Sequence, residues 1–331
     1  MNSTEQKQIA AWLTASGGSC ELELINDGSV QAKALERFCQ QLTDCGPGVT
    51  IKNRPPDTDA EKAAIVIGRR LKYQAVPLGP ELGPFLETAA SQMDQKSDPP
   101  AAGAHALEAL TVPAHLDIYI APQCPHCPQT VGQLLPMIQA NHNISITVID
   151  GTLFTDLADM ARIKSVPTVM LDTDFRRTGS VDMNELTDTI INRDPVKLGP
   201  LTLRSFIDDG RAADLAQMMI KAQTVFPALI NLITHDLWSI RLGAMVVAEE
   251  IAWEDRPLAG TLIPALEKRF ADVNETVQGD ILHVIGESGA PPNLPFLESV
   301  AAAADNEDLR EAARDAIASI REYTVKPGPT D

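Results

Sequence analysis

Two cysteines three residues apart are the strongest chemical signal in this chain. Cys124, Pro125, His126 and Cys127 stand between a predicted strand and a predicted helix. At that place the first sulfur faces unpaired backbone N–H groups of the helix N-terminus, which favour a thiolate. His126 is expected to add partial positive charge beside Cys124, stabilise the thiolate and make the disulfide a stronger oxidant. Because the second cysteine can resolve a mixed disulfide, the spacing predicts dithiol–disulfide exchange.

A zinc site and an inert cysteine pair are the two alternatives. Zinc needs about four ligands, but the sequence has no second Cys-x-x-Cys and its other histidines show no ligand spacing. We therefore expect no metal. Cys20, Cys39 and Cys45 are predicted to be small buried apolar residues, although a disulfide between Cys39 and Cys45 stays open.

Val166 and Pro167 open a predicted strand at 168–171. Proline is tolerated in a strand only at an end or an edge. A simple proline at a strand start is one explanation, and a proline that packs beside the cysteine pair is the other.

The elements around these residues follow the order β-α-β-α-β-β-α, which is that of the thioredoxin fold. They are predicted at 115–121, 125–140, 144–149, 155–162, 168–171, 175–178 and 182–192, with Pro136 as a kink. The first segment repeats this order at 21–25, 30–42, 49–52, 64–67, 72–75 and 80–90. An internal duplication is the simplest explanation.

The last segment is predicted to be helical and repetitive. Asp236 and Arg241 recur as Asp305 and Arg310 with the same offset, whereas Asp280 interrupts the pattern in between. Each repeated aspartate precedes an apolar-periodic stretch and is expected to cap the second helix of a pair. The pattern resembles HEAT repeats, which stack helix pairs into a solenoid. An irregular helical bundle is the alternative.

Changes in composition give the domain boundaries. We expect a unit without a cysteine pair at 1–93, a linker at 94–104, a unit with the Cys-Pro-His-Cys site at 105–193 and helical repeats at 201–325.

Charge and cysteine usage restrict partners and location. The formal net charge is −18, which argues against nucleic acid and anionic membranes as partners. No segment looks like a signal peptide or a membrane span. Because five cysteines are too few for a secreted disulfide framework, a cytoplasmic location is expected.

Residues 1–193 resemble the tandem thioredoxin-fold unit at the N-terminus of the F component of bacterial alkyl hydroperoxide reductase. They are also similar to glutaredoxin-like protein disulfide oxidoreductases, which are built from two such folds. The motifs that carry the resemblance are Cys124 to Pro128, Ile149-Asp150-Gly151 with Phe154, Val166-Pro167, Gly179 with 182–186, and Pro77 to Glu81.

The resemblance assigns roles to these residues. It implies that Cys124 attacks, that Cys127 resolves, and that Pro167 is cis, excludes metal from the cysteines and offers backbone to an extended substrate. It also implies that the two units share one sheet, with Glu81 near the disulfide of the second unit. The alternative for Glu81 is a solvated acid at a helix start.

The sequence departs from this family in two ways. The first unit has Asn26 to Ser29 in place of a cysteine pair and Ala63-Ala64 in place of the proline, so it is expected to be redox-silent. The chain also has no Gly-x-Gly-x-x-Gly motif, so no cofactor is expected and a separate protein must supply electrons.

Two functions remain. The first is a dithiol–disulfide oxidoreductase that relays electrons between a separate reductase, similar to thioredoxin reductase, and a protein client such as a peroxiredoxin. In this function the helical repeats dock a partner. The second is a redox-sensing adaptor that acts mainly by binding proteins through the repeats. The sequence identifies neither the client nor the oligomeric state.

Overall fold

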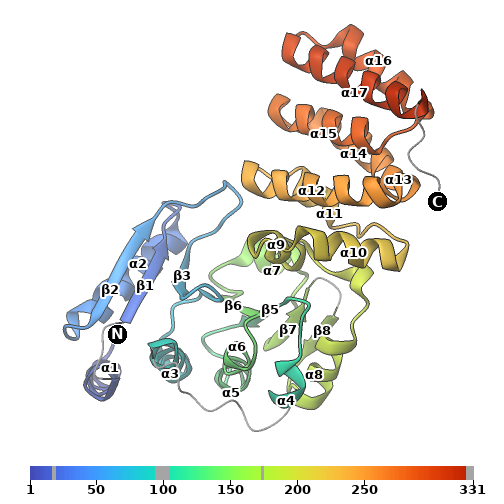
Figure 1. The fold of residues 1–331 in the computed structure, drawn as a ribbon. Helices are drawn as coiled ribbons and strands as arrows, with labels where there is room; N and C mark the ends of the chain where they lie inside the picture. The colour runs from blue at the N-terminus through green and yellow to red at the C-terminus, as the bar shows by residue number, and fades with distance from the viewer. Residues whose placement is uncertain (17–19, 94–103, 173–174, 326–331) are drawn as a thin grey trace. The chain divides into compact units, whose positions relative to one another are not determined.

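The computed structural model describes residues 1–16, 20–93, 104–172 and 175–325. The chain divides into two compact units, Met1–Arg193 and Asp194–Asp331 (Figure 1). The first unit combines one β-sheet with helices, and the described part of the second unit is helical.

One eight-stranded sheet runs through the first unit, in the order β2-β1-β3-β4-β6-β5-β7-β8. The strands are β1 Cys20–Ile25, β2 Val49–Arg54, β3 Ala64–Ile67, β4 Leu71–Gln74, β5 Ala114–Ile120, β6 Ile144–Asp150, β7 Thr168–Leu171 and β8 Phe175–Thr178. In each half the first strand pairs parallel with the second and antiparallel with the third, which forms a hairpin with the fourth. Parallel pairing of β4 with β6 joins the halves.

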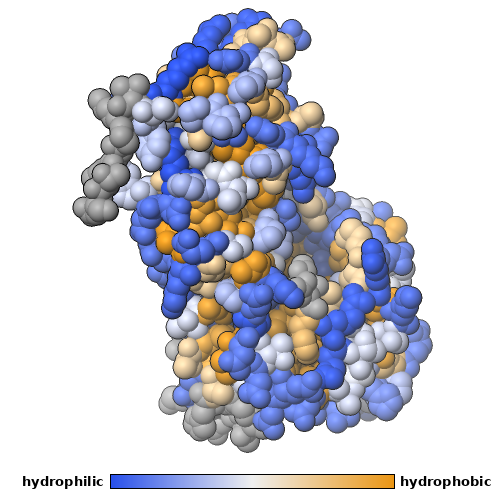
Figure 2. All heavy atoms as spheres, turned by 90° about the vertical axis from the view of Figure 1, so that its right-hand side faces the viewer, coloured by the Kyte–Doolittle hydropathy of each residue, from blue (hydrophilic) through white to orange (hydrophobic). Residues whose placement is uncertain are grey.

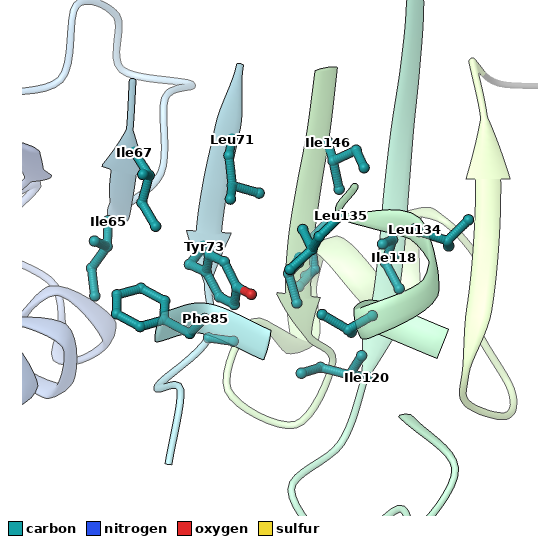
Figure 3. Packing of buried hydrophobic residues seen from close by; sticks show 14 of the residues in the cluster. Ile65, Ile67, Leu71, Tyr73, Phe85, Ile118, Ile120, Leu134, Leu135 and Ile146 are labelled. Carbon is teal, nitrogen blue, oxygen red and sulfur yellow. The ribbon is translucent and has the colours of Figure 1, made fainter. Parts of the chain in front are cut away.

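The hydrophobic core is continuous across both halves of the sheet. The helices of this unit are α1 Ser3–Ser16, α2 Val30–Asp44, α3 Leu82–Met93, α4 Ala104–Glu108, α5 Cys127–Leu134, α6 Met137–Ala140, α7 Thr155–Met160 and α8 Met183–Asn192. Figure 3 shows Phe85 of α3 and Leu134 of α5 packed against strand residues such as Ile65, Tyr73 and Ile118. Complete burial of such a side chain contributes about 1.5–3 kcal/mol, so the two halves stabilise each other.

Polar contacts also connect the two halves. The Arg70 guanidinium, between β3 and β4, donates to the carbonyl oxygens of Ile138 and Asn141 at the end of α6. The Gln31 amide at the start of α2 donates to the carbonyl of Leu153 at 3.1 Å. These bonds satisfy carbonyl groups that end a helix or lie in a loop.

The helices differ from the predicted ones in several places. The predicted helix at 125–140 starts two residues later and is two helices, α5 and α6, because proline at 136 cannot continue the hydrogen-bond ladder. The segment at 80–90 begins one residue earlier, as a 3₁₀ turn, Gly79–Glu81. Helices α1 and α4 were not predicted, since α1 has little amphipathic pattern and α4 is short. Most of the predicted linker, residues 94–103, lies outside the described residues.

The second unit contains nine described helices, three of which pack side by side in chain order. The helices are α9 Pro200–Asp208, α10 Ala212–Ala222, α11 Leu229–Ile233, α12 Trp238–Glu254, α13 Arg256–Ala259, α14 Ile263–Arg269, α15 Glu275–Ser288, α16 Leu294–Ala303 and α17 Glu307–Val325. Helix α15 packs between α12 and α17, and α11, α14 and α16 each contact the longer helix that follows. Hydrophilic side chains cover most of the face in Figure 2, with hydrophobic ones exposed between them.

The expected aspartate caps are wrong. Asn274 caps α15, accepting from the Val277 N–H at 3.1 Å, and Asn306 accepts from the Asp308 N–H at 2.8 Å. Asn306, directly after Asp305, offers the same acceptor one residue closer to its helix, and α12, after Asp236, begins with no side-chain cap.

The repeated arginine holds the turn that precedes its own helix. Arg241 donates to the carbonyl of Asp236 at 2.8 Å, and Arg310 donates to that of Ala304 at 2.7 Å. Arg241 also pairs with Asp280 of α15 at 2.6 Å. Asp280, which interrupts the sequence pattern, therefore connects neighbouring helices.

Candidate active site

The cysteine pair lies at the start of α5, directly after β5. Cys124 is half-buried and Cys127 is buried, and the Cys127 N–H donates to the Cys124 sulfur at 3.2 Å. This amide is one of the unpaired donors at the helix N-terminus, and it stabilises negative charge on the sulfur that accepts from it. The structure therefore brings together a reachable sulfur and a hidden second thiol.

The two thiols have different surroundings. Burial raises the pKa of the Cys127 thiol to about 12, and its hydrogen bond with Cys124 acts in the same direction. Cys127 therefore stays protonated at neutral pH unless a base removes its proton. All five cysteines are free thiols, so Cys39 and Cys45 form no disulfide here.

The loop before β7 lies beside the pair. The Val166–Pro167 peptide bond is cis, and the Cys124 thiol lies 3.8 Å from the Val166 carbonyl oxygen. The Pro167 carbonyl accepts from the Gly179 N–H at 2.8 Å. A hydrogen bond of 2.9 Å between the Thr168 and Thr178 hydroxyls ties the loop to β8.

Glu81 is buried, with 5% of its surface exposed. Neither carboxylate oxygen has a hydrogen-bond partner within the described part of the chain. Because burial penalises the charged form, the pKa of Glu81 rises to about 7. The solvated helix-start alternative for this residue is therefore wrong.

The charge of Glu81 affects the pKa of two other side chains. It helps to raise the pKa of the Cys127 thiol and that of the Tyr73 hydroxyl, although burial is the main cause for both. The Tyr73 ring packs edge-on against Phe85, with centroids 5.1 Å apart. Figure 3 shows the hydroxyl directed away from Phe85 toward the second half of the sheet. Sequence reasoning missed Tyr73, because a strand tyrosine gives no local sign of an acidic neighbour.

The turn that carries Glu81 is held by α1. The Glu5 carboxylate accepts from the Gly79 N–H at 2.8 Å and from the Asn2 N–H at 2.6 Å. Gly79 has φ +61°, a left-handed conformation that suits glycine. Glu5 was also missed, since it lies 74 residues before Gly79 in a helix without a clear sequence signal.

His126 adjoins the pair from the solvent side. It is exposed and stands at the N-cap of α5, where its side chain makes no capping hydrogen bond. The imidazole is therefore open to an approaching partner.

The corresponding loop of the first half has different chemistry. Asp27, three residues before α2, occupies the place that Cys124 has relative to α5, and its carboxylate accepts from the Ala63 N–H at 3.2 Å. Burial alone would raise the pKa of Asp27, but hydrogen bonds from Ser29 and Ala63 lower it overall. Alanine restores the N–H that proline lacks, so a carboxylate–amide bond replaces the sulfur–proline contact.

No cluster of three His, Cys, Asp or Glu side chains among the described residues could hold a metal ion. None of the helices in the described ranges has the length and apolar character of a membrane span.

Comparisons with known proteins support a thioredoxin-like fold for the first unit. Residues 114–192 match the thioredoxin domain family. The N-terminal half carries a thioredoxin-like α/β domain. The F component of alkyl hydroperoxide reductase from Pseudomonas putida is 22% identical over 198 residues, covering 57% of this chain and 37% of the relative. The Pseudomonas aeruginosa protein is 24% identical over 187 residues, covering 54% and 35%. The chain thus spans about a third of the length of these relatives.

Two solved structures share the fold. The N-terminal domain of the F component of alkyl hydroperoxide reductase from Enterococcus faecalis superposes with a TM-score of 0.50 at 17% identity, covering 57% of this chain and 99% of that one. A protein disulfide oxidoreductase from Aeropyrum pernix gives a TM-score of 0.51 at 17% identity, covering 60% and 95%. At this identity the likeness concerns the fold alone.

Proposed function

We propose that this protein is a dithiol–disulfide oxidoreductase whose first 193 residues are two thioredoxin-type units, the second of which is active. The observation that carries the proposal is the arrangement of the pair at α5. One sulfur accepts a helix N–H beside the cis proline, and the other is buried near an acid. The Asp27–Ala63 bond supports a redox-silent first unit.

The proposed exchange has two steps. The Cys124 thiolate attacks a client disulfide, forms a mixed disulfide and releases one client sulfur, which takes up a proton. The Cys127 thiol then loses its proton and attacks the Cys124 sulfur, which releases the second client sulfur as a thiolate. Two electrons pass to the client and the pair ends as a disulfide.

Glu81 suits the proton transfer in the second step. A carboxyl with a pKa of about 7 is partly ionised at neutral pH, so it can accept the Cys127 proton or donate one in the reverse reaction. A carboxylate of ordinary pKa would be a weaker base for a thiol whose pKa is about 12. Glu81 is therefore proposed as general acid–base.

A separate reductase is proposed to return two electrons to the disulfide, and a protein client such as a peroxiredoxin to consume them. The names of the curated relatives support a reductase relay, and the helical unit, proposed to be HEAT-like, would dock a partner. No cofactor takes part within this chain in the proposed scheme.

Insulin reduction with dithiothreitol tests the activity. We expect turnover by the wild type and none by Cys124→Ser, while Cys127→Ser should retain client proteins as mixed disulfides through Cys124. An inactive wild type that still captures partners through its helical unit would favour the redox-sensing adaptor.

His126 is proposed to favour the Cys124 thiolate by adding partial positive charge beside it. His126→Gly should therefore make the disulfide more reducing, as measured by equilibration with glutathione. An unchanged redox potential would remove His126 from the site.

A further inference from the structure

Helix α12 exposes an apolar stripe. Trp238, Leu242, Val246 and Trp253 are spaced by four, four and seven residues, which puts them along one side of the helix. Trp238 is 59% exposed and Trp253 is 89% exposed. Several exposed apolar side chains on one side of a helix favour a binding surface there.

Side-chain contacts between neighbouring helices show which sides of α15 and α17 lie next to the stripe of α12. Glu249, on the same side of α12 as the stripe, pairs with His283 of α15 at 2.7 Å. Glu287 of α15 accepts from the Ser319 hydroxyl of α17 at 3.0 Å. The face that contains the stripe therefore continues over α15 onto α17.

The α17 part of the face is acidic. Asp308, Glu311 and Asp315 are exposed and recur at helical spacing with Ser319. The basic residues of this helix lie elsewhere: Arg310 and Arg314 pair with Glu307, and Arg321 pairs with Glu298 of α16.

Helix α15 lies between the apolar stripe of α12 and the acidic side of α17. Its exposed side begins with small residues, Thr276 and Gly279. A Cβ added at Gly279 would meet no atom within 4 Å, so the surface is open there. An open hollow of about 610 Å³ lies at this end, lined by Asp236, Arg241, Val273, Asn274, Glu275 and Thr276.

We infer that this apolar–acidic face of α12, α15 and α17 binds an amphipathic helix of a partner protein, with one apolar side and one side rich in lysine or arginine. The inference specifies the partner-docking role that the proposed function gives to the helical unit, and it rests on that proposed function. Helices pack about 8–10 Å apart, so a helix over α15 would contact α12 and α17 together. Its apolar side would cover the stripe, and its basic side would meet the α17 carboxylates.

The test uses the full-length protein and a labelled peptide of about 18 residues, roughly five helical turns. In the peptide, leucines are spaced so that they form one side of a helix, and lysines form the other side. A scrambled peptide of the same composition is the control. We expect saturable binding by fluorescence anisotropy, weakened by salt, and a blue shift of tryptophan emission as Trp238 and Trp253 become covered. The scrambled peptide should bind at least about tenfold more weakly.

Surface variants test the apolar stripe of α12 and the acidic side of α17 separately. Val246→Glu and Asp315→Lys should each weaken binding about tenfold or more. Val30→Glu, at a 75% exposed apolar residue of α2, is the matched control and should bind like wild type. Circular dichroism checks that each variant is folded. Equal binding of the scrambled peptide, or unchanged binding by Val246→Glu, would reduce the effect to general acidity and overturn the inference.

Insulin reduction separates this inference from the proposed function. Val246→Glu should keep wild-type turnover, because the dithiol site lies in the other unit. Peptide binding by a wild type without turnover would refute the oxidoreductase and leave the docking face. A wild-type dimer in sedimentation that Val246→Glu dissociates would mean that a second copy occupies the face, which would also overturn the inference.

Discussion

At the scale of single residues, the burial of Glu81 has a cost in stability and suits the catalytic role proposed for it. Its carboxyl is buried without a hydrogen-bond partner in the described structure, so ionisation is unfavourable. The same burial brings its pKa to about 7, where proton exchange at neutral pH is most effective. These opposite effects can be measured separately, one as a rate and the other as a free energy of unfolding.

The first effect concerns the rate of disulfide exchange. If Glu81 accepts the Cys127 proton, the resolving step should slow as pH falls through about 7, because the base becomes protonated. Glu81→Gln should remove that inflection and slow exchange, by up to about 10²–10⁴-fold where general base help operates fully. Stopped-flow exchange with a small disulfide from about pH 5 to 8 measures this. Exposed Glu87, six residues after Glu81 on α3, provides the control Glu87→Gln, and wild-type rates for Glu81→Gln at every pH would exclude the role.

The second effect concerns the free energy of unfolding. The folded pKa of Glu81 is raised from the ordinary value of 4.5 to about 7, so the folded state binds its proton more tightly than the unfolded state. Stability should therefore fall as pH rises from about 4.5 to about 7 and stay lower above that range. Glu81→Gln should gain up to about 3 kcal/mol over wild type at about pH 8 and little at about pH 4. Urea unfolding at both pH values measures the difference, and a gain of equal size at both would contradict it.

At the scale of elements, the turn before α3 determines where Glu81 lies. Since its carboxylate has no partner in the described residues, the backbone from Leu78 to Glu81 must position it. The Glu5–Gly79 bond connects that backbone to α1. Helix α1 thus helps to fix the backbone turn that carries Glu81.

Removing this bond should change the pH profile. Glu5→Ala should cost about 1 kcal/mol of stability and let water reach Glu81, so the inflection in exchange rate should move below pH 7. Glu5→Gln keeps an acceptor oxygen and should restore the profile in part. Loss of stability with an unchanged inflection would show that Glu5 supports only the fold.

At the scale of the whole molecule, the chain divides after Arg193, and the proposed dithiol site and the proposed docking face lie in different units. A protein of residues 1–193 should fold and reduce insulin at the full-length rate, since the pair, Pro167 and Glu81 all lie within it. It should lose the Leu–Lys peptide binding proposed for α12, α15 and α17. Circular dichroism with the insulin assay checks this, and a folded but inactive fragment would mean that the helical unit contributes to the site.

The sequence by itself determined the features that depend on near neighbours. The strand–turn–helix pattern around Cys124, the hairpin at 168–178 and the proline break at 136 follow from periodicity and from the backbone limits of proline, which act over a few residues. The cis proline and the shared sheet came from a resemblance. Only the tertiary structure decided that Glu81 is buried, that Glu5 holds its turn, and that Asp280 joins two helices. Those outcomes depend on desolvation and on contacts between residues tens of positions apart, and local sequence pattern carries neither.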